Sequence, residues 1–310
     1  MTRRFLIAGS SGLVGSALVR ALEKRDEEVI KVDRRVVDLR DKDETLAFFS
    51  NTRPSVVICA AARVGGILDN AQHPVDFIDD NLAIQGNVFL ASHLTSVKKL
   101  IFLGSSCIYP RNAIQPIKEQ YLMTGPLEET NKAYAVAKIV GLVSVDSYRK
   151  QYGHDWISVM PTNLYGPNDN FNLKTAHVIP ALINKMIEAK AEGRAEVEVW
   201  GEGDALREFM HVDDLADAIL HVESRYSGED FINLGSGDEI TIRELAKLIA
   251  NLVGFEGHLK LNPSYPSGTP RKLLDSSKLI ELGWKPRIQL KDGLRDTIDW
   301  YQKNVSIARM

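Results

Sequence analysis

The chain has 310 residues, 44% of them hydrophobic and 25% charged, an ordinary composition for a globular protein with a substantial core. Lys and Arg number 38 against 41 Asp and Glu, a formal net charge of −3; this balance argues against nucleic-acid coats and membrane-surface proteins, which need a basic excess. Two cysteines make neither a disulfide framework nor a zinc set, and no apolar stretch is long enough to span a bilayer.

The compartment is predicted from the cysteines and the N-terminus. Cys59 lies inside an apolar run and is expected in the core, and the cysteine usage favours a reducing environment. The apolar run near the N-terminus, about five residues before Gly9, is too short for the core of a signal peptide. We therefore expect a cytoplasmic protein without a bound metal.

The first half of the chain alternates short β-branched runs with amphipathic segments. Strands are predicted at residues 5–8, 28–32, 55–60, 100–103 and 156–160. Helices are predicted at residues 13–25, 42–51, 75–94 and 134–152. Apolar strands separated by helices predict a doubly wound α/β fold, whose parallel sheet is covered on both faces and meets ligands at the carboxyl ends of its strands.

The second half is less regular. It contains predicted helices at 179–191, from 211, from 241 to 252 and ending near 301, with strands at 196–200 and 231–234. Asp213 and Thr241 are suited to capping the second and third of these helices. Pro263, Pro266 and Pro270 mark a long loop. Without repeats or a linker, the two halves are expected to pack into one compact unit.

A glycine-rich turn, GSSGLVG, joins the first strand to the first helix. Glycines permit positive φ and a close approach of the backbone to a pyrophosphate, while the helix N-terminus offers free N–H groups to the anion. The spacing is GxxGxxG, which differs from the GxGxxG of many dehydrogenases. The predicted dinucleotide contacts here are Gly9, Ser10, Ser11, Gly12, Leu13, Val14 and Gly15.

The second strand ends at Asp33, followed by Arg34 and Arg35. An acidic residue at this position favours NAD by holding the ribose hydroxyls, whereas arginines accommodate the 2′-phosphate of NADP. A solvated charge cluster is the third possibility. Asp38 and Leu39, just beyond, are expected near the adenine.

The strand ending at residue 103 is followed by hydroxyl and thiol side chains, and the segment from Tyr134 reads YAVAK. Tyr134 and Lys138 project from one helical face, one turn apart. A lysine ammonium near the phenol is expected to lower its pKa from the usual value near 10 toward neutrality. Ser105 would hydrogen-bond the substrate oxygen that Tyr134 protonates, and Lys138 would hold the nicotinamide ribose.

This order of features resembles the extended short-chain dehydrogenase/reductase family, with Ser105, Tyr134 and Lys138 on its catalytic positions. Within that family, further segments are similar to epimerase-reductases that act on GDP-4-keto-6-deoxy-D-mannose. These segments are AARVGGI from Ala61, FLGSSCIYP from Phe102, PTNLYGPNDNF from Pro161, HVIPAL from His177, VWGEG from Val199, REFMHVDDLA from Arg207 and GTPRKLLD from Gly268. The resemblance covers essentially the whole chain.

The resemblance implies a Rossmann-like sheet domain with a smaller, discontinuous α/β C-terminal domain for the substrate. The expected sheet domain comprises residues 1–165, with 208–235 returning to it; residues 166–207 and 236–310 form the other. The family also implies a homodimer. The helices predicted at 75–94 and 134–152 carry more apolar surface than one sheet face needs, which suits a helix-bundle interface.

The resemblance further implies a two-stage reaction on a GDP-sugar, epimerisation at C3 and C5 and then reduction at C4 by NADP(H). Cys107 and His177 would be the acid–base pair of the epimerisation; cysteine and histidine ordinarily titrate at roughly 8.5 and 6.5, on either side of neutrality. Taken alone, Cys107 could be a small buried hydrophobe and His177 a helix-capping residue. Tyr134 would supply the proton for the reduction.

The remaining implied contacts fall into two groups. Additional cofactor residues are Ala60, Ala61, Ala62, Pro161, Thr162, Asn163, Leu164 and His177. Substrate residues are Ser105, Ser106, Cys107, Asn163, Lys185, Trp200, Arg207 and Asp275. Arginine suits a diphosphate because its planar fork gives bidentate hydrogen bonds, and Trp200 could instead be interdomain packing. Ser11 stands where relatives are expected to carry an arginine for the 2′-phosphate, which leaves that task to Arg34 or Arg35.

Two other functions remain open. Another nucleotide-sugar epimerase or dehydratase of the same family would use NAD, but a dehydratase wants an acidic pair where Ser106 and Cys107 stand, and a 4-epimerase has no use for Cys107 or His177. A redox-sensing binding protein that kept the fold without catalysis would usually lose the tyrosine or the lysine, and here both remain.

Overall fold

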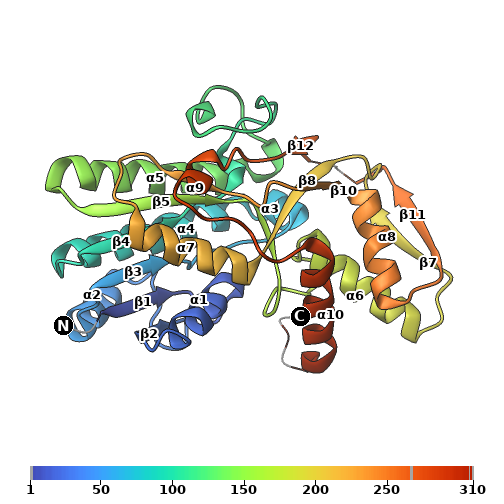
Figure 1. Cartoon of the computed structure of the whole chain (residues 1–310), viewed down its shortest axis with the longest axis horizontal. Helices are drawn as coiled ribbons and strands as arrows, with labels where there is room; N and C mark the ends of the chain where they lie inside the picture. Colours follow the sequence, from blue (N-terminus) through green and yellow to red (C-terminus); the bar gives the residue numbers. More distant parts are fainter. Residues whose placement is uncertain (1–2, 266–267, 307, 309–310) are drawn as a thin grey trace.

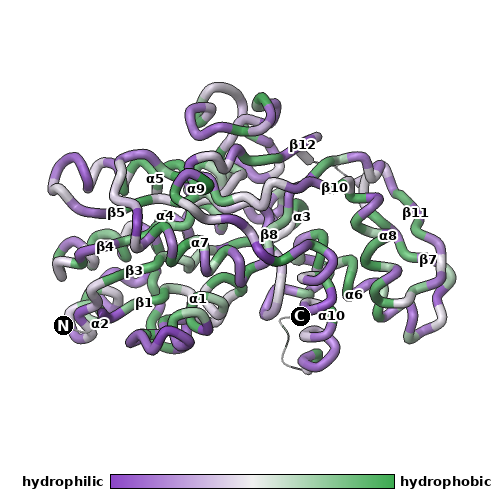
Figure 2. Tube along the Cα trace, viewed as in Figure 1, coloured by the Kyte–Doolittle hydropathy of each residue, from purple (hydrophilic) through white to green (hydrophobic). Residues whose placement is uncertain are grey.

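The computed structural model describes residues 3–265, 268–306 and 308, so Pro266 of the predicted proline loop lies outside the described residues. The chain forms two adjoining parts (Figure 1), a larger one built on a parallel sheet and a smaller one from the second half of the sequence. In Figure 2 the central strands are mainly hydrophobic and many outer loops hydrophilic, as expected when the strands form the core.

The larger part contains one six-stranded, fully parallel sheet. Its strands are β1 (Arg4–Ala8), β2 (Glu28–Val32), β3 (Val56–Cys59), β4 (Lys99–Leu103), β5 (Asp155–Pro161) and β9 (Ile232–Leu234). Their order is β2-β1-β3-β4-β5-β9, so the chain moves one way from β1 to β2 and the other way from β3 onward. The doubly wound parallel sheet predicted from the sequence is confirmed, and its switch point lies between β1 and β3, where such folds bind ligands.

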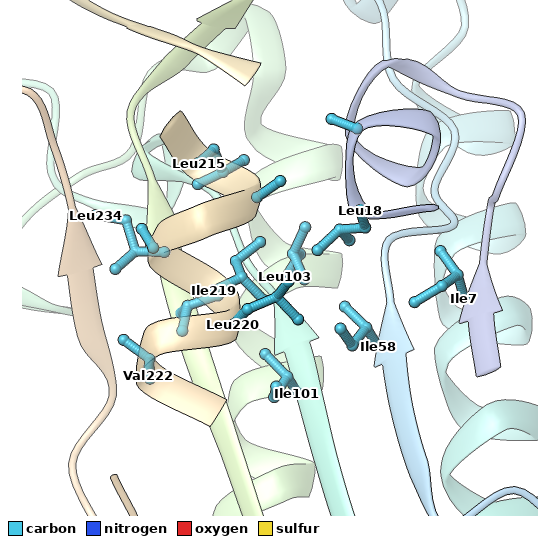
Figure 3. Close-up of a cluster of buried hydrophobic side chains, with 14 of the residues drawn as sticks. Ile7, Leu18, Ile58, Ile101, Leu103, Leu215, Ile219, Leu220, Val222 and Leu234 are labelled. Carbon is cyan, nitrogen blue, oxygen red and sulfur yellow. The ribbon is translucent and has the colours of Figure 1, made fainter. Parts of the chain in front are cut away.

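Helices cover both faces of this sheet. Successive side chains of a strand point to opposite faces, so apolar strands must be covered on both sides. On one face, α1 (Leu13–Glu23) and α7 (Val212–Arg225) cover a core that includes Ile7, Ile58, Ile101 and Leu103 (Figure 3). On the other face, α2 (Lys42–Thr52), α4 (Pro74–Leu94) and α5 (Lys132–Tyr152) cover Leu6, Val57 and Phe102. Cys59 belongs to this second core and is fully buried, as predicted.

The smaller part is an α/β unit with its own core. Its strands are β6 (Asn163–Tyr165), β8 (Leu206–His211), β10 (Glu239–Thr241) and β12 (Arg271–Lys272) in one sheet, and β7 (Glu196–Trp200) parallel to β11 (His258–Asn262) in another. Its helices are α6 (Val178–Ala191), α8 (Ile242–Val253) and α10 (Leu290–Asn304). Residues from all three helices form a separate hydrophobic cluster with Phe171 and Phe209.

Several short helices, strands and turns were not predicted from the sequence. They are α3 (Ile67–Gln72), α9 (Ser277–Glu281), the strands β6, β8, β10, β11 and β12, and three 3₁₀ turns at Ser106–Ile108, Glu119–Tyr121 and Glu129–Asn131. Thr241 caps α8 as predicted, through a reciprocal capping box with Glu244. The predicted cap Asp213 is wrong: His211 is the N-cap of α7 and accepts from the Asp213 backbone N–H, while the Asp213 carboxylate binds Arg20.

The predicted division into domains stays a prediction. Strand β9, from the segment 208–235, belongs to the parallel sheet, whereas the paired strands β6 and β8 lie at the predicted boundaries. Within the described part of the chain, no helix is long and apolar enough to cross a membrane. Residues 3–265, 268–306 and 308 also contain no group of three or more His, Cys, Asp or Glu side chains arranged for a metal ion.

Candidate active site

The glycine loop lies at the switch point of the sheet. Gly9 has φ +84°, and a Cβ there would lie 2.8 Å from Cα of Ala61, just after β3. A Cβ on Gly15 would overlap the Gly9 carbonyl oxygen, so only glycine lets α1 start this close to the loop. Helix α1 begins at Leu13, and its first-turn N–H groups lack intrahelical acceptors. The loop, the helix terminus and Ala60–Ala61 therefore form a cradle that fits a dinucleotide pyrophosphate.

The carboxylate of Asp33, just after β2, forms an ion pair with Arg35. The Arg35 backbone N–H and guanidinium donate to the Asp33 carboxylate at 2.9 and 2.6 Å. The side-chain hydrogen bond from Arg35 outweighs burial and lowers the pKa of Asp33 to about 2, with a further hydrogen bond from Ser11. Arg35 is thus held by its own ion pair, and Ser11 contacts the same carboxylate.

A second group of charges gathers around Asp80 on α4. Its carboxylate lies 3.7 Å from Arg34, 3.1 Å from Arg40 and 3.3 Å from Arg63. Arg40 also binds Asp38, one of the residues expected near the adenine, and Asn87 of α4 donates to the Leu39 carbonyl at 3.0 Å. Arg40 and Arg63 were not singled out in the sequence, because they come from separate loops that only the fold brings together.

Ser105, Tyr134 and Lys138 meet at the carboxyl end of β4. The Ser105 hydroxyl is near enough to the Tyr134 phenol to lower its pKa. The Lys138 ammonium is buried, donates to the Leu103 carbonyl at 2.8 Å and lies 5.8 Å from the centre of the Tyr134 ring. The structure therefore brings together the three residues that the YxxxK spacing and the strand end predicted.

The pKa of Tyr134 is raised, whereas the sequence predicted that Lys138 would lower it. Burial raises the pKa of Tyr134, the neighbouring Cys107 raises it further, and the hydrogen bond from Ser105 opposes the rise only in part. Burial likewise lowers the pKa of Lys138 to about 8. Lys138 therefore does not bring the Tyr134 pKa down toward neutrality, because its ammonium is directed at the Leu103 carbonyl.

Cys107 follows directly from the Ser105 turn. Its backbone N–H donates to the Ser105 hydroxyl at 3.2 Å, and the side chain is half-buried. The Asn131 amide donates to the Cys107 sulfur at 3.3 Å, and the Lys272 ammonium lies 3.6 Å from it. The Cys107 thiol thus has polar neighbours, whereas Cys59 lies in the hydrophobic core.

His177 occupies the N-cap position of α6, but its side chain makes no capping hydrogen bond, which leaves it available for other contacts. Neighbouring protein atoms desolvate the His177 ring in part and lower its pKa, and the charge of Lys272 lowers it further. Solvent reaches the exposed side chain and screens part of this effect. Gly66 fixes the preceding backbone: its N–H donates to Thr175, and a Cβ there would lie 2.6 Å from the Ala176 carbonyl oxygen.

The segment after β5 joins the two parts of the molecule. The Thr162 hydroxyl and the Asn163 amide donate to the Glu208 carbonyl at 3.2 and 2.8 Å. These bonds hold Pro161–Leu164 beside the carboxyl ends of β5 and β9. Ser106 is buried against a cavity that Cys107 also lines.

Lys185 and Trp200 lie together in the smaller part. The Lys185 ammonium lies 4.8 Å from the centre of the Trp200 ring, and the ring of Tyr265 stacks on Trp200 at 4.4 Å and 6°. Burial lowers the pKa of Lys185, against the influence of Glu198. The stack on Tyr265, within the proline-marked loop, was not predicted from the sequence.

Arg207 and Asp275 have different surroundings. Burial lowers the pKa of Arg207, while Cys107 and Glu128 oppose this shift, and Arg207 lies opposite Lys272, which contacts the Cys107 sulfur. The Asp275 carboxylate accepts from the Ser277 backbone N–H at 2.9 Å and from its hydroxyl at 2.5 Å at the start of α9. These contacts join Arg207 to the Cys107 region, and they give Asp275 a role in holding α9.

Comparison with known proteins agrees with this geometry. The model of the NAD dependent epimerase/dehydratase family matches residues 5–235. GDP-L-fucose synthase 1 of Arabidopsis thaliana is 54% identical over 97% of this chain and 94% of its own, and GDP-L-fucose synthase of Escherichia coli K12 is 47% identical over 97% of each. A crystal structure of a GDP-L-fucose synthetase from Naegleria fowleri bound to NADP has a TM-score of 0.92 at 30% identity, covering 100% of this chain and 98% of that one.

Proposed function

Because the chain belongs to the NAD dependent epimerase/dehydratase family, we propose that it converts GDP-4-keto-6-deoxy-D-mannose to GDP-L-fucose with NADPH. The relatives that share about half of its residues over nearly the whole chain are named GDP-L-fucose synthase. One observation carries the proposal. The thiol of Cys107, with its polar neighbours, and the Ser105–Tyr134–Lys138 trio lie at the same strand end. These two groups suit an epimerisation and a reduction of the same ketone.

In the epimerisation, Cys107 and His177 exchange protons with the carbons beside the ketone. The C–H bond at C3 breaks as one of the two side chains takes the proton, and its electron pair moves onto the keto oxygen. The other side chain then returns a proton to the opposite face, and the same sequence follows at C5. Ser105 and Tyr134 donate hydrogen bonds to the negative keto oxygen of the enolate.

In the reduction, the Tyr134 phenol donates a proton to the C4 oxygen. The raised pKa of Tyr134 keeps it protonated at neutral pH, which suits a proton donor. The bound cofactor supplies the hydride to C4. Lys138, beside Tyr134 near the end of β4, would hold the nicotinamide ribose, and Pro161–Leu164 would line the nicotinamide.

The cofactor is NADP(H), as in the structural neighbour bound to NADP. The loop from Gly9 to Gly15 and the N-terminus of α1 would hold the pyrophosphate. For the 2′-phosphate we propose Arg34. Arg35 is tied to Asp33, whereas Arg34 is 63% exposed and lies 3.7 Å from its nearest carboxylate.

The GDP moiety would bind across the smaller part. Arg207 would hold the diphosphate near Cys107, and Lys185 and Trp200 the nucleoside. Ser106 and Asn163 would line the sugar. The family resemblance also implies that Asp275 contacts the GDP-sugar. In the structure its carboxylate accepts a hydrogen bond from Ser277.

The proposed enzyme is a homodimer located in the cytoplasm. A homodimer would form through α4 and α5, since Val140 and Val143 of α5 are exposed beside an apolar surface that includes Ile139 and Tyr152. The cytoplasm is the expected location, because Cys59 and Cys107 are both free thiols.

The deciding experiment gives the purified protein GDP-4-keto-6-deoxy-D-mannose with NADPH or NADH and identifies the product by NMR. We expect GDP-L-fucose, formed faster with NADPH. No GDP-L-fucose with either cofactor would refute the proposal. Conversion of another nucleotide sugar with tightly held NAD would instead favour an epimerase or dehydratase of the same family.

A further inference from the structure

Lys272 reaches the catalytic strand end from a distant part of the chain. It lies on β12, which runs parallel to β8 with Lys272 opposite Arg207. Its ammonium lies 3.6 Å from the Cys107 sulfur, although 165 positions separate the two residues. Among the described residues, no carboxylate lies within ion-pair distance of Lys272. No described carboxylate therefore neutralises the Lys272 ammonium, which contacts the Cys107 sulfur.

Asn131 approaches the same sulfur from another direction. It precedes α5, the helix that carries Tyr134 and Lys138, and its amide nitrogen lies 3.3 Å from the Cys107 sulfur. A neutral thiol is a weak acceptor, whereas a thiolate is a strong one. Two donors converging on one sulfur therefore fit a side chain that carries negative charge during part of a catalytic cycle.

Lys272 contacts Cys107 directly and also acts electrostatically on His177, the other residue proposed for proton transfer. Lys272, Asn131, Thr269 and Cys107 line one small open cavity, whose other charged residue, Glu128, is paired with Arg111 at 3.1 Å. The charge of Lys272 also contributes to lowering the pKa of His177. One cation thus influences both Cys107 and His177.

We propose that Lys272 is a positioning residue for proton transfer at Cys107, holding the sulfur together with Asn131 and compensating its negative charge. The inference rests on the proposed function, whose epimerisation it deepens. When the Cys107 S–H bond breaks and its proton goes to the substrate carbon, the electron pair stays on sulfur, where the ammonium and the amide stabilise it. When the sulfur takes a proton from carbon, the same donors have held the thiolate beforehand.

Lys272 could instead serve only as a ligand of the substrate diphosphate, beside Arg207. The two roles differ in a measurable way. A diphosphate ligand contributes to KM and leaves the thiol unaffected in the free enzyme, whereas a positioning residue changes the reactivity of Cys107 before any substrate binds.

The first measurement is the rate at which iodoacetamide alkylates Cys107 in the free full-length protein at pH 7.5, followed by peptide mass mapping. We expect Lys272→Met and Asn131→Ala each to slow alkylation several-fold, and Lys272→Arg to restore most of the rate. Lys247→Met, which removes an exposed lysine on α8, is the matched control and should react like the wild type. Unchanged alkylation in both Lys272→Met and Asn131→Ala would overturn the inference.

The second measurement is solvent-deuterium incorporation at C3 and C5 at saturating substrate. Lys272→Met should slow it about tenfold or more, the effect of removing a charge-assisted hydrogen bond, with rescue by Lys272→Arg. A raised KM with wild-type exchange at saturation would overturn the positioning role in favour of a diphosphate ligand. If the wild type itself exchanges no protons, the proposed function fails, and the alkylation rates still decide whether Lys272 acts on Cys107.

Discussion

Tyr134 and Lys138 show how burial changes the chemistry that a sequence spacing suggests. The spacing placed both residues on one face of α5, and the structure has them there. Burial, however, raises the pKa of Tyr134 and lowers that of Lys138 to about 8. A one-turn separation on a helix gives proximity, but the side-chain direction depends on neighbours such as the Leu103 carbonyl, which only the fold supplies.

These shifts predict a pH dependence for the reduction. Lys138 is protonated below about pH 8 and loses its charge above it, whereas Tyr134 remains a protonated donor throughout this range. The value of kcat/KM, which reports groups of the free enzyme, should therefore fall as the pH rises through about 8. The check is a pH profile from 6.5 to 9.5 against Lys138→Met, which should be slow and lack this limb; a flat wild-type profile would contradict the assignment.

The adjacent arginines Arg34 and Arg35 allow a matched test of cofactor preference. Arg35 is bound to Asp33 at 2.6 Å, while Arg34 is the more loosely held cation. Arg34→Ala should weaken NADPH binding about tenfold and leave NADH binding nearly unchanged, because one charge-assisted contact to the 2′-phosphate is lost. Fluorescence titration of both cofactors measures this; a larger loss in Arg35→Ala would assign the phosphate to Arg35.

At the scale of elements, long periodic segments were predictable and short ones were not. Apolar residues dominate the five N-terminal strands, and the main helices between them, α1, α2, α4 and α5, span at least 11 residues each. Strands such as β10 and β12 have three and two residues, too few for any pattern. Their pairing with β8 depends on contacts that the sequence does not display.

The junction of β1 and α1 depends on one glycine whose substitution gives a sharp test. Gly15→Ala would place a Cβ on the Gly9 carbonyl oxygen and should lower the free energy of unfolding by about 1–3 kcal/mol, as overpacking does. NADPH binding should weaken as well, because the loop must move. Urea unfolding and cofactor titration measure both effects.

The control for this substitution is Gly125→Ala, in an exposed loop where the nearest atom to an added Cβ is the Pro110 Cβ at 3.3 Å. It should change the free energy of unfolding by less than about 0.5 kcal/mol, as surface substitutions do. Equal effects of the two substitutions would show that the contact between Gly15 and Gly9 is unimportant.

At the scale of the whole molecule, the sequence predicted the parallel sheet and the candidate residues on its strand ends, but not the surroundings of those residues. Ser105, Cys107 and Tyr134 are close in sequence to strand β4 or to the helix that follows, so pattern and resemblance could find them. Lys272, Asn131 and Tyr265 come from loops and short strands placed by tertiary packing. The two-part architecture brings them to the site.

The central claim is that one site carries out two separable reactions, and two substitutions measured side by side test it most directly. Substrate is incubated in D₂O with NADPH, and deuterium at C3 and C5 is followed by NMR while NADPH oxidation is followed by absorbance. Tyr134→Phe should retain part of the deuterium incorporation, because Ser105 still donates to the enolate oxygen, and lose nearly all NADPH oxidation, whereas Cys107→Ser should lose the incorporation and still bind NADPH. Loss of both reactions in Tyr134→Phe, or wild-type incorporation in Cys107→Ser, would contradict the account.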